Sequence, residues 1–281
     1  MKELWNRTFE LFRRHVVLWV PCSIAGILML WLGKLERAEI RWFVRVFATQ
    51  HSVLGGEVPP ANFAQMQHRA MMLTYPSAFL KYLLEVSLFV VALAATKNLV
   101  CMILNEQRPD MTGALQRVLP RSREVVLLSL KYIAALAVFG GVLIVIGSSP
   151  LTSDRIHEFA LSKAFIYVFA LVGEACIAWL LLPAAIRLLQ PPGTPSVTNA
   201  GRRLGTAFAV ASSALALLLE YLVGRAENAL TFDKPWESEA IAVMNTIIFN
   251  TPQVLLFIAL ALLAMQTSGE VNTLDEEPGI A

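Results

Sequence analysis

Six ionisable side chains lie inside long apolar runs of the sequence, where a charge is costly and therefore informative: Lys81, Glu85, Lys97, Lys131, Glu174 and Glu220. A charge at the centre of a bilayer costs about 3 kcal/mol or more, so each residue is a candidate for ion transport or for an ion pair. Lys81 and Glu85 are one helical turn apart and can pair within their own helix. The others need partners on other helices or at the membrane interface.

Glu174 is the most informative of these residues because it lies near the centre of its apolar run, between Gly173 and Ala175. Small residues allow helices to approach closely. A carboxylate held there needs a cation, hydrogen bonds or a proton. Lys97 is the first candidate partner and Lys131 the second. One interpretation makes Glu174 a proton or cation site in a transport pathway, and the other makes it half of a structural ion pair or a protonated acid.

A second polar cluster surrounds Pro252 in the last apolar run, where Asn250, Thr251 and Gln253 follow one another closely. If the proline breaks the helix, Asn250 and Gln253 can bind an ion or a substrate through unwound backbone. The alternative is that these side chains form hydrogen bonds to neighbouring helices.

The sequence has no group of residues typical of catalysis or of metal binding. The four histidines are scattered over the amino terminus and the connections, with no paired acids at metal-ligand spacing. The three cysteines each lie in an apolar run without C-x-x-C spacing, which argues against a disulfide framework or a metal site. We therefore predict no enzymatic activity, no metal and no cofactor. The net charge of +2 gives no indication of nucleic-acid binding.

The elements that must position these residues follow from composition and apolar length. Apolar residues make up 56% of the chain and charged residues 16%, whereas soluble domains contain about 25% charged residues. A helix needs about 20 apolar residues to cross a membrane, and the sequence has six such segments: 16–33, 78–104, 125–147, 161–189, 205–224 and 241–265. This predicts an all-α, polytopic membrane helix bundle forming one domain over 1–266. Residues 267–281 are predicted to be a disordered acidic tail.

The distribution of Lys and Arg among the connections predicts the orientation. The amino-terminal lead and the second and fourth connections are basic, which places both chain ends in the cytoplasm, at a plasma or inner membrane. The first connection, 34–77, is basic as well. Its Arg37, Arg41 and Arg45 repeat opposite an apolar side, which predicts a helix lying in the outer interface or a soluble helix packed on the outer loops. A turn-rich break is expected from Gly55 to Pro60.

Basic amphipathic segments precede the first, third and fifth spans. This predicts three copies of a surface helix followed by a membrane hairpin. The alternative is that any cytoplasmic helix entering a membrane is basic and amphipathic. Each base near an anionic leaflet contributes about 1 kcal/mol. The candidate contacts with lipid headgroups or with a protein partner are Arg13, Arg14, Arg117, Arg121, Arg202 and Arg203.

Two stretches resemble a known family. Residues 93–96 (LAAT) to 113–117 (GALQR), continuing into 125–128 (VVLL), are similar to the second-to-third-span region of the membrane domain associated with bacterial glycerophosphodiester phosphodiesterases and its stand-alone six-span relatives. Residues 182–185 (LPAA) to 198–204 (TNAGRRL) are similar to the fourth-to-fifth connection of that family, without the leucine and serine of its helix. The resemblance implies six-span architecture. It implies no phosphodiesterase activity, because that chemistry belongs to a separate soluble barrel domain.

These observations favour a non-enzymatic membrane scaffold or envelope-homeostasis protein, whose basic cytoplasmic helices contact lipid headgroups or a partner. The alternative is a transporter or permease that uses Glu174, Lys97 and a broken last span. A membrane enzyme acting on lipids would need clustered acids or histidines near an interface, and the sequence offers none.

Overall fold

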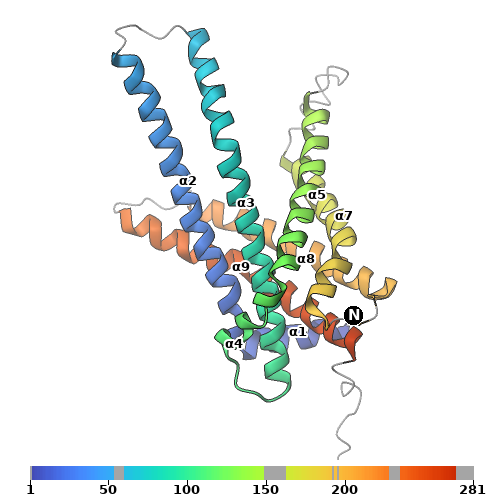
Figure 1. Ribbon diagram of the computed structural model, residues 1–281. Helices are drawn as coiled ribbons and strands as arrows, with labels where there is room; N and C mark the ends of the chain where they lie inside the picture. The colour runs from blue at the N-terminus through green and yellow to red at the C-terminus, as the bar shows by residue number, and fades with distance from the viewer. Residues whose placement is uncertain are drawn as a thin grey trace, which may run out of the picture.

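The computed structural model describes residues 2–53, 60–148, 163–191, 193–194, 196–227 and 235–269, and within these ranges it contains helices and no strand. The elements are α1 (Lys2–Arg14), the 3₁₀ helix η1 (Val16–Trp19), α2 (Val20–Val53), α3 (Pro60–Leu104), α4 (Met111–Gln116), the 3₁₀ helix η2 (Leu119–Arg121), α5 (Ser122–Ser148), α7 (Lys163–Leu189), α8 (Asn199–Glu227) and α9 (Pro235–Ser268). The prediction of an all-α helix bundle is confirmed (Figure 1).

Six segments of the described helices are long and apolar enough to cross a membrane: Val16–Leu35, Ser77–Leu104, Met111–Val142, Val168–Leu189, Asn199–Val223 and Ile241–Ser268. Each overlaps one of the six segments expected from the sequence. The helices extend beyond these apolar segments. Their polar ends can do so because the backbone groups there are hydrogen-bonded within the helix.

Helix α9 is the centre of the bundle. Every residue from Phe257 to Met265 is buried, and α9 packs against α1, α2, α3, α7 and α8. A helix that is apolar all round must be covered on all sides. The other spans expose many of their apolar side chains, as expected for helices that face lipid.

Two glycines mark the closest approaches between helices. A Cβ atom on Gly26 of α2 would come within 2.3 Å of Nδ2 of Asn250 and 2.7 Å of Cγ2 of Thr246 on α9. A Cβ atom on Gly205 of α8 would come within 2.5 Å of Cδ2 of Leu182 on α7. Larger residues at either position would push the two helices apart.

The prolines within the spans do not end their helices. Pro183 lies inside α7 and Pro252 inside α9, and both helices are continuous. The sequence-based expectation of a broken last span is therefore wrong. Pro21 lies in the first turn of α2, where its missing N–H would have had no helical partner.

Helices α2 and α3 form a long hairpin that extends past the other helices (Figure 1). With 34 and 45 residues, they are about 51 and 68 Å long, compared with a hydrocarbon core of about 30 Å. Residues 34–53 continue α2 without interruption, so the predicted separate interfacial helix is wrong. The end of the predicted break, Pro60, begins α3, and the stretch 54–59 lies outside the described residues.

The predicted surface helices are found in two of three places. Helix α1 precedes the first span, and the short α4 precedes the third. Before the fifth span the basic segment is simply the first part of α8, which runs unbroken from Asn199 to Glu227. The predicted tail from 267 is helical as far as Ser268, and residues 270–281 lie outside the described residues.

Candidate functional site

Most of the candidate bases lie at one end of the bundle, which we call the α1 end. It comprises α1, α4, the start of α5 and the carboxyl-terminal ends of α7 and α9 (Figure 1). Trp5 of α1 stacks on Phe208 of α8, with ring centroids 4.4 Å apart. Helix α1 is therefore fixed across this end.

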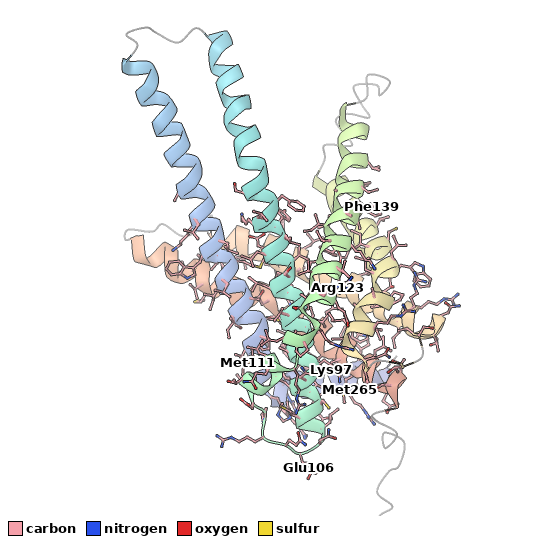
Figure 2. The ribbon with its side chains drawn as sticks, in the orientation of Figure 1. Lys97, Glu106, Met111, Arg123, Phe139 and Met265 are labelled. Atoms are coloured by element: carbon pink, nitrogen blue, oxygen red, sulfur yellow. The ribbon has the colours of Figure 1, made fainter. Side chains whose placement is uncertain are left out.

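A basic cavity of about 190 Å³ opens at the α1 end, between α3, the α4–η2 segment and the end of α7. Three bases line it, namely Lys97, Arg117 and Arg121. The remaining lining residues are neutral: Ala94, Asn98, Val118, Leu188, Leu189, Gln190 and Pro191. Figure 2 shows Lys97 at this end of α3. We call this site the basic cavity.

Helix α4 sets the position of Arg117. The Asp110 carboxylate accepts hydrogen bonds from the backbone N–H groups of Thr112 (3.0 Å) and Gly113 (2.9 Å), which caps the first turn. A Cβ atom at Gly113 would come within 2.8 Å of an Asp110 carboxylate oxygen, so the cap needs glycine there. The Nδ2 group of Asn98 donates to the Ala114 carbonyl at 3.0 Å and fixes α4 to α3.

Arg121 closes the cavity against α7. Its guanidinium donates to the carbonyl of Leu188, in the last turn of α7, where carbonyl groups lack helical partners. Its Nε atom also lies 3.9 Å from the Glu124 carboxylate. Arg121 therefore has a structural role in addition to its charge.

Gln190 holds the far wall of the basic cavity. It is only 2% exposed, and its Nε2 group donates to Oγ1 of Thr267 on α9. Its buried Oε1 atom has no hydrogen-bond partner among the described residues. A buried acceptor left unsatisfied is costly, and a ligand that carries a proton can satisfy it.

Arg202, predicted to contact lipid or a partner, is instead part of the packing between α7 and α8. Its Nε atom donates to the carbonyl of Trp179 at 2.6 Å, and its guanidinium lies 4.4 Å from the centre of the Trp179 ring. In an uninterrupted helix this carbonyl would accept from the residue four positions later. That residue is Pro183, which has no N–H. Arg202 therefore supplies the donor that Pro183 lacks.

The other candidate contact residues are accessible. Arg13, Arg14, Arg117 and Arg203 are exposed, whereas Arg121 is partly covered. Arg14 also pairs with Glu10, one turn earlier on α1, at 2.9 Å. The α1 end thus presents several exposed bases outside the basic cavity.

The structure does not bring Glu174 and Lys97 together. Lys97 lines a cavity with Leu188, whereas Glu174 precedes Leu188 by fourteen residues on α7, about 21 Å along the helix axis. Gly173, next to Glu174, packs on Phe139, and Figure 2 shows Phe139 far from Lys97. The predicted pairing of these two residues is therefore wrong.

Glu174 itself is half-buried and lies within electrostatic range of Tyr132 on α5. Lys131, the second candidate partner, is exposed on α5. Glu174 lines neither the basic cavity nor the cavities beside Ile27, Gly33 and Asn6.

The polar cluster of the last span is used for helix contacts. Asn250 is buried and donates from Nδ2 to the carbonyl of Cys22 on α2 at 3.0 Å. Ser212 on α8 donates to the carbonyl of Pro252 at 2.7 Å. The Oε1 atom of Gln253 is buried without a partner in the described part of the chain. Asn250 therefore matches the interpretation as an interhelical hydrogen bond.

The sequence interpretation missed three residues of functional weight: Asn98, Gln190 and Trp179. Asn98 and Gln190 are polar residues at the ends of apolar runs, a position that is usually solvated. Trp179 carried a usable signal, because it lies four residues before a proline inside a helix. No group of His, Cys, Asp and Glu that could hold a metal occurs among the described residues.

No family model, no curated protein and no solved structure matches this chain. The kind of protein is therefore identified by its own six spans, which are long and apolar enough to cross a bilayer. The chain is an integral membrane protein. Its α1 end and its spans are the parts of the molecule that bear on its function.

Proposed function

We propose that this chain is a non-enzymatic membrane scaffold of a plasma or inner membrane, which contacts anionic lipid headgroups with its α1 end. In this proposal both chain ends lie in the cytoplasm, and a protein partner can share the same face. The observation that supports this proposal most directly is the position of helix α1. One face of this helix is attached to the bundle, and its other faces stay exposed.

Helix α1 has three faces. Leu4, Thr8 and Leu11 are buried against the bundle. Next to them around the helix are the aromatic residues Trp5 and Phe9, and Phe9 is 55% exposed. The remaining face is polar and carries Lys2, Glu3, Asn6, Arg7, Glu10, Arg13 and Arg14. Aromatic and basic faces side by side are typical of a helix that lies in the membrane interface.

The proposal is tested with spin-labelled lipids in vesicles that contain the reconstituted chain. The measured quantity is the association of phosphatidylglycerol relative to phosphatidylcholine. Since each base contributes about 1 kcal/mol near an anionic leaflet, the double variant Arg13→Glu, Arg14→Glu should reduce this ratio about fivefold per residue. An unchanged ratio would exclude α1 as the lipid contact.

Glu174→Gln is the matched control, because it removes an ionisable group from a span without touching the α1 end. It should leave the lipid ratio unchanged. The same vesicles are used for a flux screen, since transport through Glu174 is the competing function. Loss of flux in Glu174→Gln, with normal lipid preference, would favour a transporter over a scaffold.

We also propose that the chain is related to the stand-alone six-span relatives of the phosphodiesterase membrane domain. The support is the sequence of residues 93–128 and 182–204, which forms the walls of the basic cavity and the α7–α8 contact. The enzymatic activity of that family is not part of the proposal.

A further inference from the structure

We propose that the basic cavity binds a phosphate group with net negative charge, presented by an anionic lipid headgroup or by a soluble phosphomonoester. This inference deepens the proposed function and rests on it for the supply of anionic lipid. It differs in naming one cavity, open at the surface, rather than a charged face.

The charges of the cavity point to an anion. Lys97, Arg117 and Arg121 line it, and none of the described residues that line it is acidic. Arg121 also contacts an acid outside the lining, since its Nε atom lies 3.9 Å from the Glu124 carboxylate. Two guanidinium groups and an ammonium match the oxygens of a phosphate better than they match a single carboxylate.

The size and depth of the cavity suit a headgroup. Its volume of about 190 Å³ corresponds to about six waters at their liquid volume of about 30 Å³. Lys97 lies seven residues before the end of α3, about 10 Å along the helix axis. Arg117 and Pro191 at the rim are exposed, so a ligand can enter from the surface.

Gln190 supplies an independent indication of a ligand. Gln190 lines the cavity, and its Oε1 atom is buried without a partner among the described residues. The hydroxyl of a monoprotonated phosphomonoester can donate to this atom while the other phosphate oxygens accept from the bases. A phosphomonoester would thereby bind to the neutral wall of the cavity, at Gln190, as well as to the three bases.

A competing explanation is that the bases only neutralise the carboxyl-terminal end of α7. Arg121 does this through its bond to the Leu188 carbonyl. Arg117 comes from a different wall, one residue after α4, and is exposed. Stabilisation of α7 therefore gives no reason for Arg117 to line the cavity, whereas a phosphate ligand does.

The test uses the full chain in dodecylmaltoside micelles and a phosphatidic acid with a fluorescent acyl chain. Arg117→Gln and Lys97→Gln should each weaken binding about fivefold, the effect of one base.

The matched control is Arg187→Gln, which removes an exposed base from the last turn of α7 outside the cavity lining. It should change binding by less than about twofold, since it contributes no group to the cavity. Gel filtration and thermal unfolding check that each variant is folded, and Arg117, as an exposed residue, remains informative if Lys97→Gln does not fold.

Competition distinguishes the sources of the phosphate. Unlabelled dioctanoyl phosphatidic acid should displace the probe, whereas dioctanoylglycerol, which lacks the phosphate, should not. Displacement by inorganic phosphate or glycerol 3-phosphate at similar concentrations would identify a soluble ligand, and displacement by the lipid alone would identify a headgroup. Equal binding by wild type and Arg117→Gln, or displacement by dioctanoylglycerol, would overturn the proposal. If the lipid preference through Arg13 and Arg14 persists in that case, the scaffold proposal stands without the cavity.

Discussion

At the scale of single residues, the structure separates bases that look alike in the sequence. Arg202 and Arg203 are neighbours in a basic segment, yet Arg203 is exposed while Arg202 is tied to Trp179. The difference arises from Pro183, which leaves the Trp179 carbonyl without its helical donor. Within a membrane such a carbonyl must be satisfied by another group. A basic residue near a span can therefore serve the bundle rather than the lipid.

This role predicts a measurable coupling between Arg202 and Pro183. Arg202→Ala should lower the free energy of unfolding by about 2 kcal/mol, because a charge-assisted hydrogen bond and a cation–π contact are lost. In a Pro183→Ala background the loss should be about 1 kcal/mol smaller, because an alanine at this position restores the N–H for the Trp179 carbonyl. A double-mutant cycle in detergent unfolding titrations measures both values, with Arg203→Ala as the neutral control. Equal losses in the two backgrounds would contradict this role of Arg202.

At the scale of the elements, caps decide where helices stop. Helix α3 ends in a Schellman motif, in which the N–H of Gln107 donates to the Met102 carbonyl at 2.8 Å and that of Glu106 to the Ile103 carbonyl at 3.1 Å. Glu106 holds the left-handed position of this motif, with φ of 56°. Glycine is the usual residue there, since a side chain costs energy in this conformation.

Glu106→Gly should therefore stabilise the chain by about 1 kcal/mol, which is the typical penalty of the left-handed conformation after allowance for glycine's greater unfolded entropy. Thermal unfolding in detergent gives the shift. The control is Glu106→Ala, which removes the same charge and keeps the Cβ atom. If alanine stabilises as much as glycine, charge rather than backbone conformation is the cause.

The elements also show what could be predicted from the sequence and what could not. All six spans were predictable, because apolar length alone specifies them. The course of residues 34–53 was not, since an amphipathic pattern fits a helix in the interface as well as one that continues α2. The surroundings of Glu174 were out of reach too, because they depend on which helices are neighbours and at what depth. Likewise Lys97, Arg117 and Arg121 meet only because the Asp110 cap and the end of α7 place them around one cavity.

At the scale of the whole molecule, the even number of spans and the shared position of α1 and the end of α9 constrain the topology. Helix α1 packs against α9, and the carboxyl-terminal end of α9 lies at the α1 end (Figure 1). A bundle with six crossings returns the chain to the side from which it started. The far end, in contrast, carries the long hairpin of α2 and α3.

Reporter fusions test which side is which. A fluorescent protein that matures only in the cytoplasm should be bright when fused at either chain end and dark when inserted between residues 54 and 59. An alkaline phosphatase reporter, active only outside, should give the reverse pattern. This orientation is expected because basic residues are enriched on the cytoplasmic side of membrane proteins, and in this chain they lie at the α1 end. Bright insertions at 54–59 would reverse it and would place the basic cavity on the outer side.

The central position of α9 has a consequence for biosynthesis. Among the six spans it is the last to leave the ribosome, yet α1, α2, α3, α7 and α8 all pack against it. Until α9 enters the bilayer, Gly26 of α2 lacks its neighbours Thr246 and Asn250, and the Cys22 carbonyl lacks the Asn250 amide. The earlier spans must therefore remain loosely associated within the translocation machinery or the lipid while synthesis continues. A message truncated before α9 would yield spans that can still pair, as α7 does with α8, but that lack the helix on which five others pack, and membrane quality control would recognise such a product as unassembled.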